Sequence, residues 1–108
     1  MAACTLYVTA ENRDAALSIA RALIDERLAA CVNVLGDMTS VFHWQGAVEE
    51  ATEAAFLVKT TDDLAPRTMA RIVELHDYDC PCVVKWPISG GHAPFIDWIG
   101  AETSAAKD

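Results

Sequence analysis

One segment, residues 40–61, constrains the fold more than any other part of the chain. It contains two β-prone runs, residues 41–44 and 54–59, with Gln45 and Gly46 between them. A glycine adopts positive φ without a Cβ clash, so a chain reversal at Gly46 is inexpensive. The hairpin that results is longer than a chain of 108 residues needs for its own core. Because such a ribbon has unpaired backbone at its edges, we expect the rest of the molecule and other copies of it to cover the ribbon.

Two segments with helical spacing of apolar residues flank the strands. The first extends from the N-cap candidate Asn12 to residue 29. The second follows the hairpin, where Asp62 or Asp63 can cap a helix that has Pro66 in its first turn. The residues predicted to share one face of this second helix are Ala65, Met69, Ile72, Val73 and His76.

The remaining segments complete a repeated strand-helix-strand pattern. Three short runs are β-rich: residues 5–9, 31–35 and 81–87. Gly36 is predicted to form a bulge within one long strand that continues into the hairpin. Pro94 opens a last short helix. Two strand-helix-strand units predict the α+β, ferredoxin-like βαββαβ fold, an antiparallel sheet with both helices on one face. The length favours a single domain over residues 1–108.

Charge and cysteine content narrow the classes of partner and compartment. The net charge is −8, from 16 acidic and 8 basic residues, which argues against binding to nucleic acid or to an anionic membrane surface. The first residues lack the basic region and the apolar length of a signal peptide. Four cysteines in a chain this apolar are typical of reduced thiols, so we expect a cytoplasmic protein. We expect the thiol of Cys31 to be buried and structural. Cys4, near the N-terminus, is predicted to be incidental, with no structural or chemical role.

The most distinctive chemical pattern is Cys80-Pro81-Cys82. In extended chain, residues two apart point the same way, so both thiols could bind one soft metal ion, with His76 as a third ligand. The alternative is that the two cysteines are small apolar residues on a short strand, and that His76 is a histidine bonded to a carbonyl. The sequence has no GxGxxG, phosphate-loop, GxSxG or HExxH motif, so no enzyme class is indicated.

The second hairpin arm contains a group of charged residues. Strand alternation places Glu49 and Glu53 on one face, where they could act as acid and base or as metal ligands. The alternative is that both carboxylates are solvated and protect the hairpin arm from edge-to-edge aggregation. Lys59 ends an apolar strand. If Lys59 lies in a cleft with Glu49 or Glu53, the cleft would suit an anionic or zwitterionic small molecule.

Several segments, in order along nearly the whole chain, resemble the CutA divalent-cation tolerance family. These segments are residues 26–33, 40–46, 53–60, 74–78, Pro81, 87–88 and 95–98. The resemblance implies a fold similar to that of the PII signalling proteins and a cytoplasmic homotrimer in which the hairpins pair between subunits. Trp44 and Gly46, at the hairpin tip, would then form part of the trimer seam.

The resemblance also implies copper tolerance and binding of Cu²⁺ or another divalent cation, without an organic cofactor or an established catalytic activity. Lys59, Tyr78 and Glu53 would line a cleft between subunits, and His76 would approach it. A PII-like sensor or trimeric scaffold that binds an anionic ligand in this cleft is the alternative function. An enzyme that uses Glu49 or Glu53 with His76 ranks last.

The chain departs from the family pattern around these residues. Asp77 stands where the family commonly has proline, and Cys82 stands where it has glutamate. In some members the proposed copper ligands are a thiol late in the first strand and a pair of histidines. This chain has Val8 in place of the thiol and Leu75 in place of one histidine, so His76 is the only one of these ligands that it keeps. Cys80 and Cys82 could form a softer site instead, so the predicted metal ligands are His76, Cys80 and Cys82.

Overall fold

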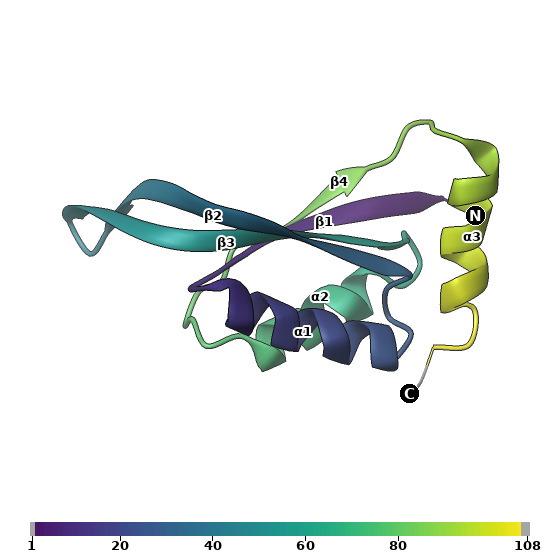
Figure 1. Cartoon of the computed structure of the whole chain (residues 1–108), viewed down its shortest axis with the longest axis horizontal. Helices are drawn as coiled ribbons and strands as arrows, with labels where there is room; N and C mark the ends of the chain where they lie inside the picture. Colours follow the sequence, from purple (N-terminus) through teal and green to yellow (C-terminus); the bar gives the residue numbers. More distant parts are fainter. Residues whose placement is uncertain (1, 107–108) are drawn as a thin grey trace.

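In the computed structural model, which describes residues 2–106, four strands form one antiparallel sheet in the order β2-β3-β1-β4. Helices α1 and α2 cover one face of the sheet, and α3 lies at the end away from the hairpin (Figure 1). This arrangement confirms the predicted ferredoxin-like fold. The elements are β1 (Ala3–Ala10), α1 (Arg13–Asp25), β2 (Cys31–Trp44), β3 (Ala47–Thr61), α2 (Ala65–Leu75), β4 (Val83–Pro87) and α3 (Ala93–Thr103).

Strands β2 and β3 form a hairpin that extends well beyond the rest of the sheet (Figure 1). Strand β1 pairs with residues 54–61 of β3, so residues 47–53 pair with β2 alone. The turn is at Gln45 and Gly46, whose φ values are 51° and 83°. Two consecutive positive φ angles are typical of the type I′ turn, whose twist matches that of the flanking strands. The hairpin therefore projects as a two-stranded ribbon.

The long strand β2 is interrupted once. Its pairing with β3 shifts register between Val34 and Asp37, which confirms the irregularity predicted at Gly36. The shift changes which side chains of the ribbon lie opposite each other. Beyond it, Met38 pairs with Glu53 and the register continues without interruption to the turn.

Helix α1 begins as predicted and ends early. The side-chain oxygen of Asn12 accepts a hydrogen bond from the backbone N–H of Ala15 at 2.8 Å, which confirms the N-cap. The helix ends at Asp25 and not at residue 29, because Arg27 has a φ of 57° that is incompatible with a continuing helix. Leu28 lies beyond the helix but is still buried in the core, which explains why the apolar spacing continued past the true end.

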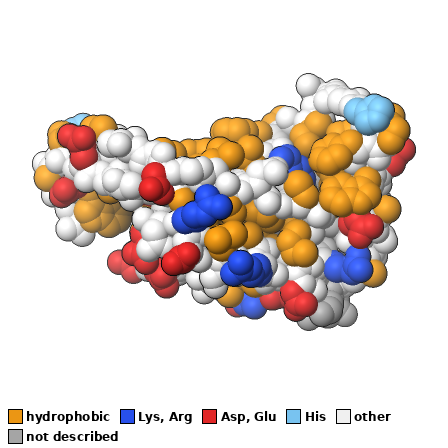
Figure 2. Space-filling model, in the orientation of Figure 1, with side chains coloured by type: hydrophobic (Ala, Val, Ile, Leu, Met, Phe, Trp, Pro, Cys, Tyr) orange, Lys and Arg blue, Asp and Glu red, His pale blue; other side chains and the backbone are white. Residues whose placement is uncertain are grey.

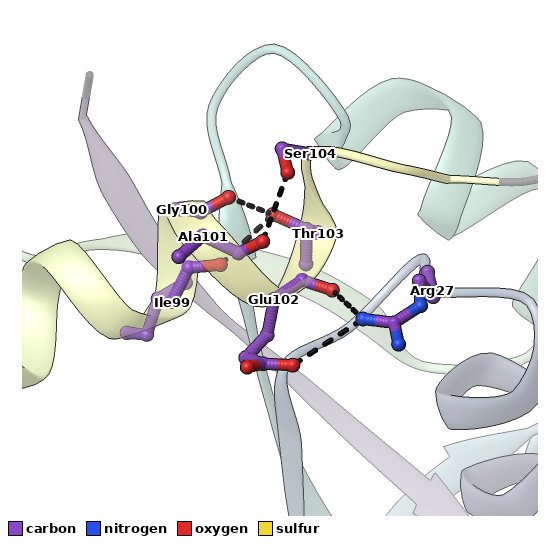
Figure 3. A network of polar contacts seen from close by, with 7 residues as sticks. All are labelled: Arg27, Ile99, Gly100, Ala101, Glu102, Thr103 and Ser104. Carbon is purple, nitrogen blue, oxygen red and sulfur yellow. Dashed lines mark hydrogen bonds and ion pairs between the residues drawn. The ribbon is translucent and has the colours of Figure 1, made fainter.

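Arg27 also connects this turn to α3 (Figure 3). Its Nη1 donates to the backbone oxygen of Glu102 at 3.1 Å and lies 3.3 Å from the Oε2 of the same residue. Both side chains are exposed, so the ion pair by itself contributes about 0–1 kcal/mol. Its main effect is therefore to orient the end of α3 against the α1–β2 connection.

Helix α2 differs from the prediction at its N-terminus. Leu64 is the N-cap residue and no side chain caps the helix, so the prediction of Asp62 or Asp63 as the cap was wrong. The carboxylate of Asp62 instead forms an ion pair with the Nζ of Lys85 at 3.0 Å, which connects the start of α2 to β4. Pro66 lies in the first turn as predicted.

The core lies between the two helices and the covered face of the sheet. Cys4, predicted to be incidental, is 0% exposed and belongs to this core. Burial, with a smaller effect of the Asp62 charge, raises the pKa of the Cys4 thiol to about 11. Of the residues predicted to share one face of α2, Ala65 and Ile72 are fully buried, whereas Val73 is 50% exposed and lies at the border of the buried face. The largest buried side chains include Leu6, Leu23, Phe56 and Ile72.

Candidate functional site

The loop between α2 and β4, residues 76–82, is anchored to the sheet by His76. The imidazole Nε2 lies 2.6 Å from the backbone oxygen of Thr9, and the Nδ1 accepts a hydrogen bond from the backbone N–H of Tyr78 at 3.1 Å. A carbonyl can only accept, so this pattern requires the proton on Nε2. Both ring nitrogens therefore have partners. Ligation of a metal by His76 would require one of these bonds to break.

Tyr78 connects the same loop to β3. Its hydroxyl donates to the Oε2 of Glu53 at 2.8 Å, and its ring lies 4.6 Å from the imidazole of His76. Burial raises the pKa of Tyr78, and the hydrogen bond to Glu53 and the charges of Glu53 and Glu11 raise it further. The structure thus brings together Tyr78 and Glu53, two of the residues predicted to line a ligand cleft.

A cavity of about 600 Å³ opens between this loop and the projecting hairpin. In Figure 2 the outline is hollowed beneath the hairpin, at the left, where acidic side chains gather. Aromatic side chains from both sides line the cavity: Phe42 and Trp44 from β2, and Tyr78 from the loop. The volume is within the range of small-molecule sites, and the aromatic lining is typical of them.

The rest of the lining is strongly acidic. Glu49 pairs with Phe42 across the hairpin, and both line the cavity with Glu53, as strand alternation predicts. No lysine, arginine or histidine belongs to this lining within residues 2–106. The cavity therefore has a negative potential that favours cations. Its acidic residues are Glu49, Glu50, Glu53, Asp77 and Asp79.

The two thiols of the Cys80-Pro81-Cys82 sequence also line the cavity. Both residues are exposed and neither forms a disulfide. Partial burial of the Cys82 thiol and the nearby charge of Glu53 raise its pKa, so a metal would have to displace a proton from this sulfur. Within residues 2–106, no three His, Cys, Asp or Glu side chains are grouped so that they could hold a metal ion.

Lys59 does not join this cavity. Its Nζ donates to the side-chain oxygen of Asn33, which also lies 3.7 Å from the Sγ of Cys31. Cys31, predicted to be buried, is only partly buried beside them. The predicted combination of Lys59 with Tyr78 and Glu53 is therefore not formed within one chain.

Sequence reasoning missed the aromatic wall of the cavity. Phe42 and Trp44 lie two residues apart on one strand, and a two-residue turn at Gln45-Gly46 sets Phe42 opposite Glu49. That register was available in the sequence once the turn was recognised. Trp44, a predicted seam residue, is 47% exposed at the hairpin tip.

These features define a class: a ferredoxin-like domain with a projecting hairpin and an acidic, aromatic cavity at its base. Comparison with known proteins gives the family. The profile of the CutA1 divalent ion tolerance protein family matches residues 4–102, and the chain belongs to this family.

Individual relatives agree with this assignment. The divalent-cation tolerance protein CutA of Thermus thermophilus is 42% identical over 91% of this chain and 95% of its own length. Protein CutA of Homo sapiens is 34% identical over 94% of this chain, which spans only 57% of that longer protein. The solved structure of the periplasmic divalent cation tolerance protein CutA from Archaeoglobus fulgidus is 36% identical, with a TM-score of 0.90 over 94% of this chain and 98% of its own.

Proposed function

We propose that the protein acts in divalent-cation tolerance as a homotrimer that binds copper or a similar divalent metal, without catalysis of its own. The observation that supports this most strongly is membership of a family named for divalent ion tolerance, over residues 4–102. The acidic cavity at the base of the hairpin supports a cationic ligand as well.

The shape of the hairpin supports assembly. Strand β2 is at one edge of the sheet and β4 at the other, so neither has a partner on its outer side within residues 2–106. Val41 and Val48, near the hairpin tip, are 65% and 66% exposed. Free strand edges beside exposed apolar residues favour covering by other copies of the chain.

Light scattering at micromolar concentration tests the trimer. We expect about three times the chain mass of 11.7 kDa. Trp44→Ala should lower the mass on dilution, because it removes apolar area from the proposed seam. Val73→Ala, which changes an equally exposed apolar residue on α2, should not. A monomer at every concentration would contradict the trimer.

Cys80 and Cys82 are the best candidate ligands for copper, because thiols prefer soft ions and these two line the same cavity. His76 could be a third ligand after giving up its bond to Thr9. A site that must be assembled in this way should bind weakly and exchange its metal readily.

Calorimetry in competition with a chelator tests these ligands. The double variant Cys80→Ser/Cys82→Ser should lose copper binding, while Cys31→Ser should keep it. Binding that is unchanged in the double variant would refute the assignment of these thiols.

We also propose a cytoplasmic location, supported by four cysteines that are all free. No helix within residues 2–106 is long and apolar enough to cross a membrane. Cell fractionation would test the location, since the Archaeoglobus relative is described as a periplasmic protein.

A further inference from the structure

The loop before β4 contains two free thiols that are separated by a single residue. Cys80 and Cys82 are both exposed, and neither forms a disulfide. Their side chains reach the same space beside the loop. Because both belong to one loop of one chain, a bond between them does not depend on how copies of the chain assemble.

The spacing of the two cysteines is compatible with a disulfide that is easily reduced. An extended chain places Cα atoms two residues apart at about 6.4–6.8 Å, the upper end of the range of about 4.4–6.8 Å that a disulfide spans. Residues 80–82 belong to no helix or strand, so a small change in the loop shortens this distance without breaking the sheet. A disulfide that requires such an adjustment is strained, and strained disulfides are typically regulatory and not structural.

The other two cysteines of the chain are not placed to compete for this bond. Cys4 is 0% exposed in the core and lies opposite Pro87, at the end of β4 away from the loop. Cys31 is on β2, which forms the edge of the sheet opposite to β4. Among the four cysteines, the two thiols of the loop are therefore each other's partners within the chain.

We propose that Cys80 and Cys82 form a dithiol–disulfide switch that turns the copper site off when it is oxidised. The control of copper rests on the proposed function, in which the same two thiols bind the metal. The oxidant is glutathione disulfide. One cysteine thiolate attacks a sulfur of this oxidant and expels a first glutathione thiolate, and the other cysteine thiolate then attacks the mixed disulfide and expels the second.

This exchange is balanced and leaves no ligand for copper. Two electrons pass from the two cysteine sulfurs to the glutathione disulfide, and the two cysteine protons end on the two glutathione thiols. The internal disulfide that remains has no thiolate, which is the form of cysteine that binds a metal.

A redox titration of the assembled protein tests the switch, in oxygen-free buffers of reduced and oxidised glutathione that contain EDTA. After acid quenching, free thiols are alkylated in denaturant and the protein is digested with trypsin. Both cysteines are then in one peptide, because no lysine or arginine lies between Arg71 and Lys85. We expect this peptide to lose two hydrogens and to carry no alkyl group. Its oxidised fraction should depend on the ratio of oxidised glutathione to the square of reduced glutathione, and excess reduced glutathione should restore the dithiol.

Matched variants identify the pair. Cys31→Ser keeps both thiols of the loop and should give the same titration as the wild type. Cys80→Ser leaves one thiol, which should carry only a glutathione adduct whose fraction follows the first power of reduced glutathione. Three results would overturn the proposal: glutathione adducts on both cysteines of the wild type, a dithiol that stays reduced at every ratio, or disulfides between copies on a non-reducing gel.

Calorimetry with copper distinguishes the switch from the proposed function. The copper is added as Cu(I) in competition with a chelator, because Cu(II) would itself oxidise the thiols. The reduced protein should bind Cu(I), and the protein with the internal disulfide should lose this binding. Binding that survives oxidation would overturn the control of the site. A reduced protein that binds no Cu(I) would refute the thiols as copper ligands, and the mass of the tryptic peptide would still decide whether the disulfide forms.

Discussion

The hydrogen bond between Tyr78 and Glu53 allows a stability prediction to be worked from the structure. Tyr78→Phe removes one hydroxyl and leaves the Oε2 of a carboxylate that is 8% exposed without its donor at 2.8 Å. A hydrogen bond to a charged group contributes about 1.5–3 kcal/mol. Since the cavity admits water to this carboxylate, we expect the lower part of that range, about 1.5–2 kcal/mol of lost unfolding free energy. For a domain of this size that corresponds to a fall in Tm of roughly 6–15 °C.

Urea unfolding at fixed protein concentration measures this loss, and Tyr7→Phe is the matched control. Among residues 2–106, the hydroxyl of Tyr7 bonds only to the sulfur of Met38, at 3.9 Å, and the stacking of its ring on Trp86 survives the substitution. A thioether is a weak acceptor, so Tyr7→Phe should lower the free energy of unfolding by less than about 0.5 kcal/mol. If Tyr78→Phe costs no more than Tyr7→Phe, the hydrogen bond to Glu53 does not stabilise the fold.

The same pair predicts a dependence on alkaline pH. The folded protein raises the pKa of Tyr78 above its value in the unfolded chain, which is about 10. The stability that this shift contributes is therefore complete below about pH 10 and is lost as the pH rises further, because the unfolded chain releases the proton first. The difference in stability between wild type and Tyr78→Phe should narrow above pH 10. A difference that stays constant would contradict the raised pKa.

Three further predictions concern other parts of the fold. Asn12→Ala should cost about 1 kcal/mol in thermal unfolding through loss of the α1 cap, and an unchanged Tm would argue against the cap. Gly46→Ala should lower the free energy of unfolding by about 1 kcal/mol, because φ is 83° at this position and a residue with a Cβ adopts such an angle only with strain. Equal stability of the variant and the wild type would mean that the turn relaxes to another conformation. Iodoacetamide at pH 8 should modify Cys80 and Cys82 and spare Cys4, as mass spectrometry would show, because Cys4 is 0% exposed with a pKa raised to about 11. Equal labelling of Cys4 in the native protein would show that the core opens readily.

The elements of the fold could be predicted because their signals are local. Apolar spacing identified both covering helices, and a glycine between two β-prone runs identified the turn at Gln45-Gly46. The errors are at positions where local and distant interactions compete. The sequence around Asp62 suggests a helix cap, but Lys85, brought near by β4, takes its carboxylate instead. Arg27 ends α1 in a left-handed conformation that the apolar spacing does not reveal.

The candidate site depended much more on the tertiary structure. Strand alternation alone placed Glu49 and Glu53 on one face of the hairpin, and the turn type set their register with Phe42. Only the packed fold brings Tyr78 to Glu53 and occupies both nitrogens of His76, because these contacts join segments far apart in the chain. Local patterns determine which residues share a strand or helix face. Long-range packing decides which of those faces meet, and therefore which side chains of the loop reach the hairpin.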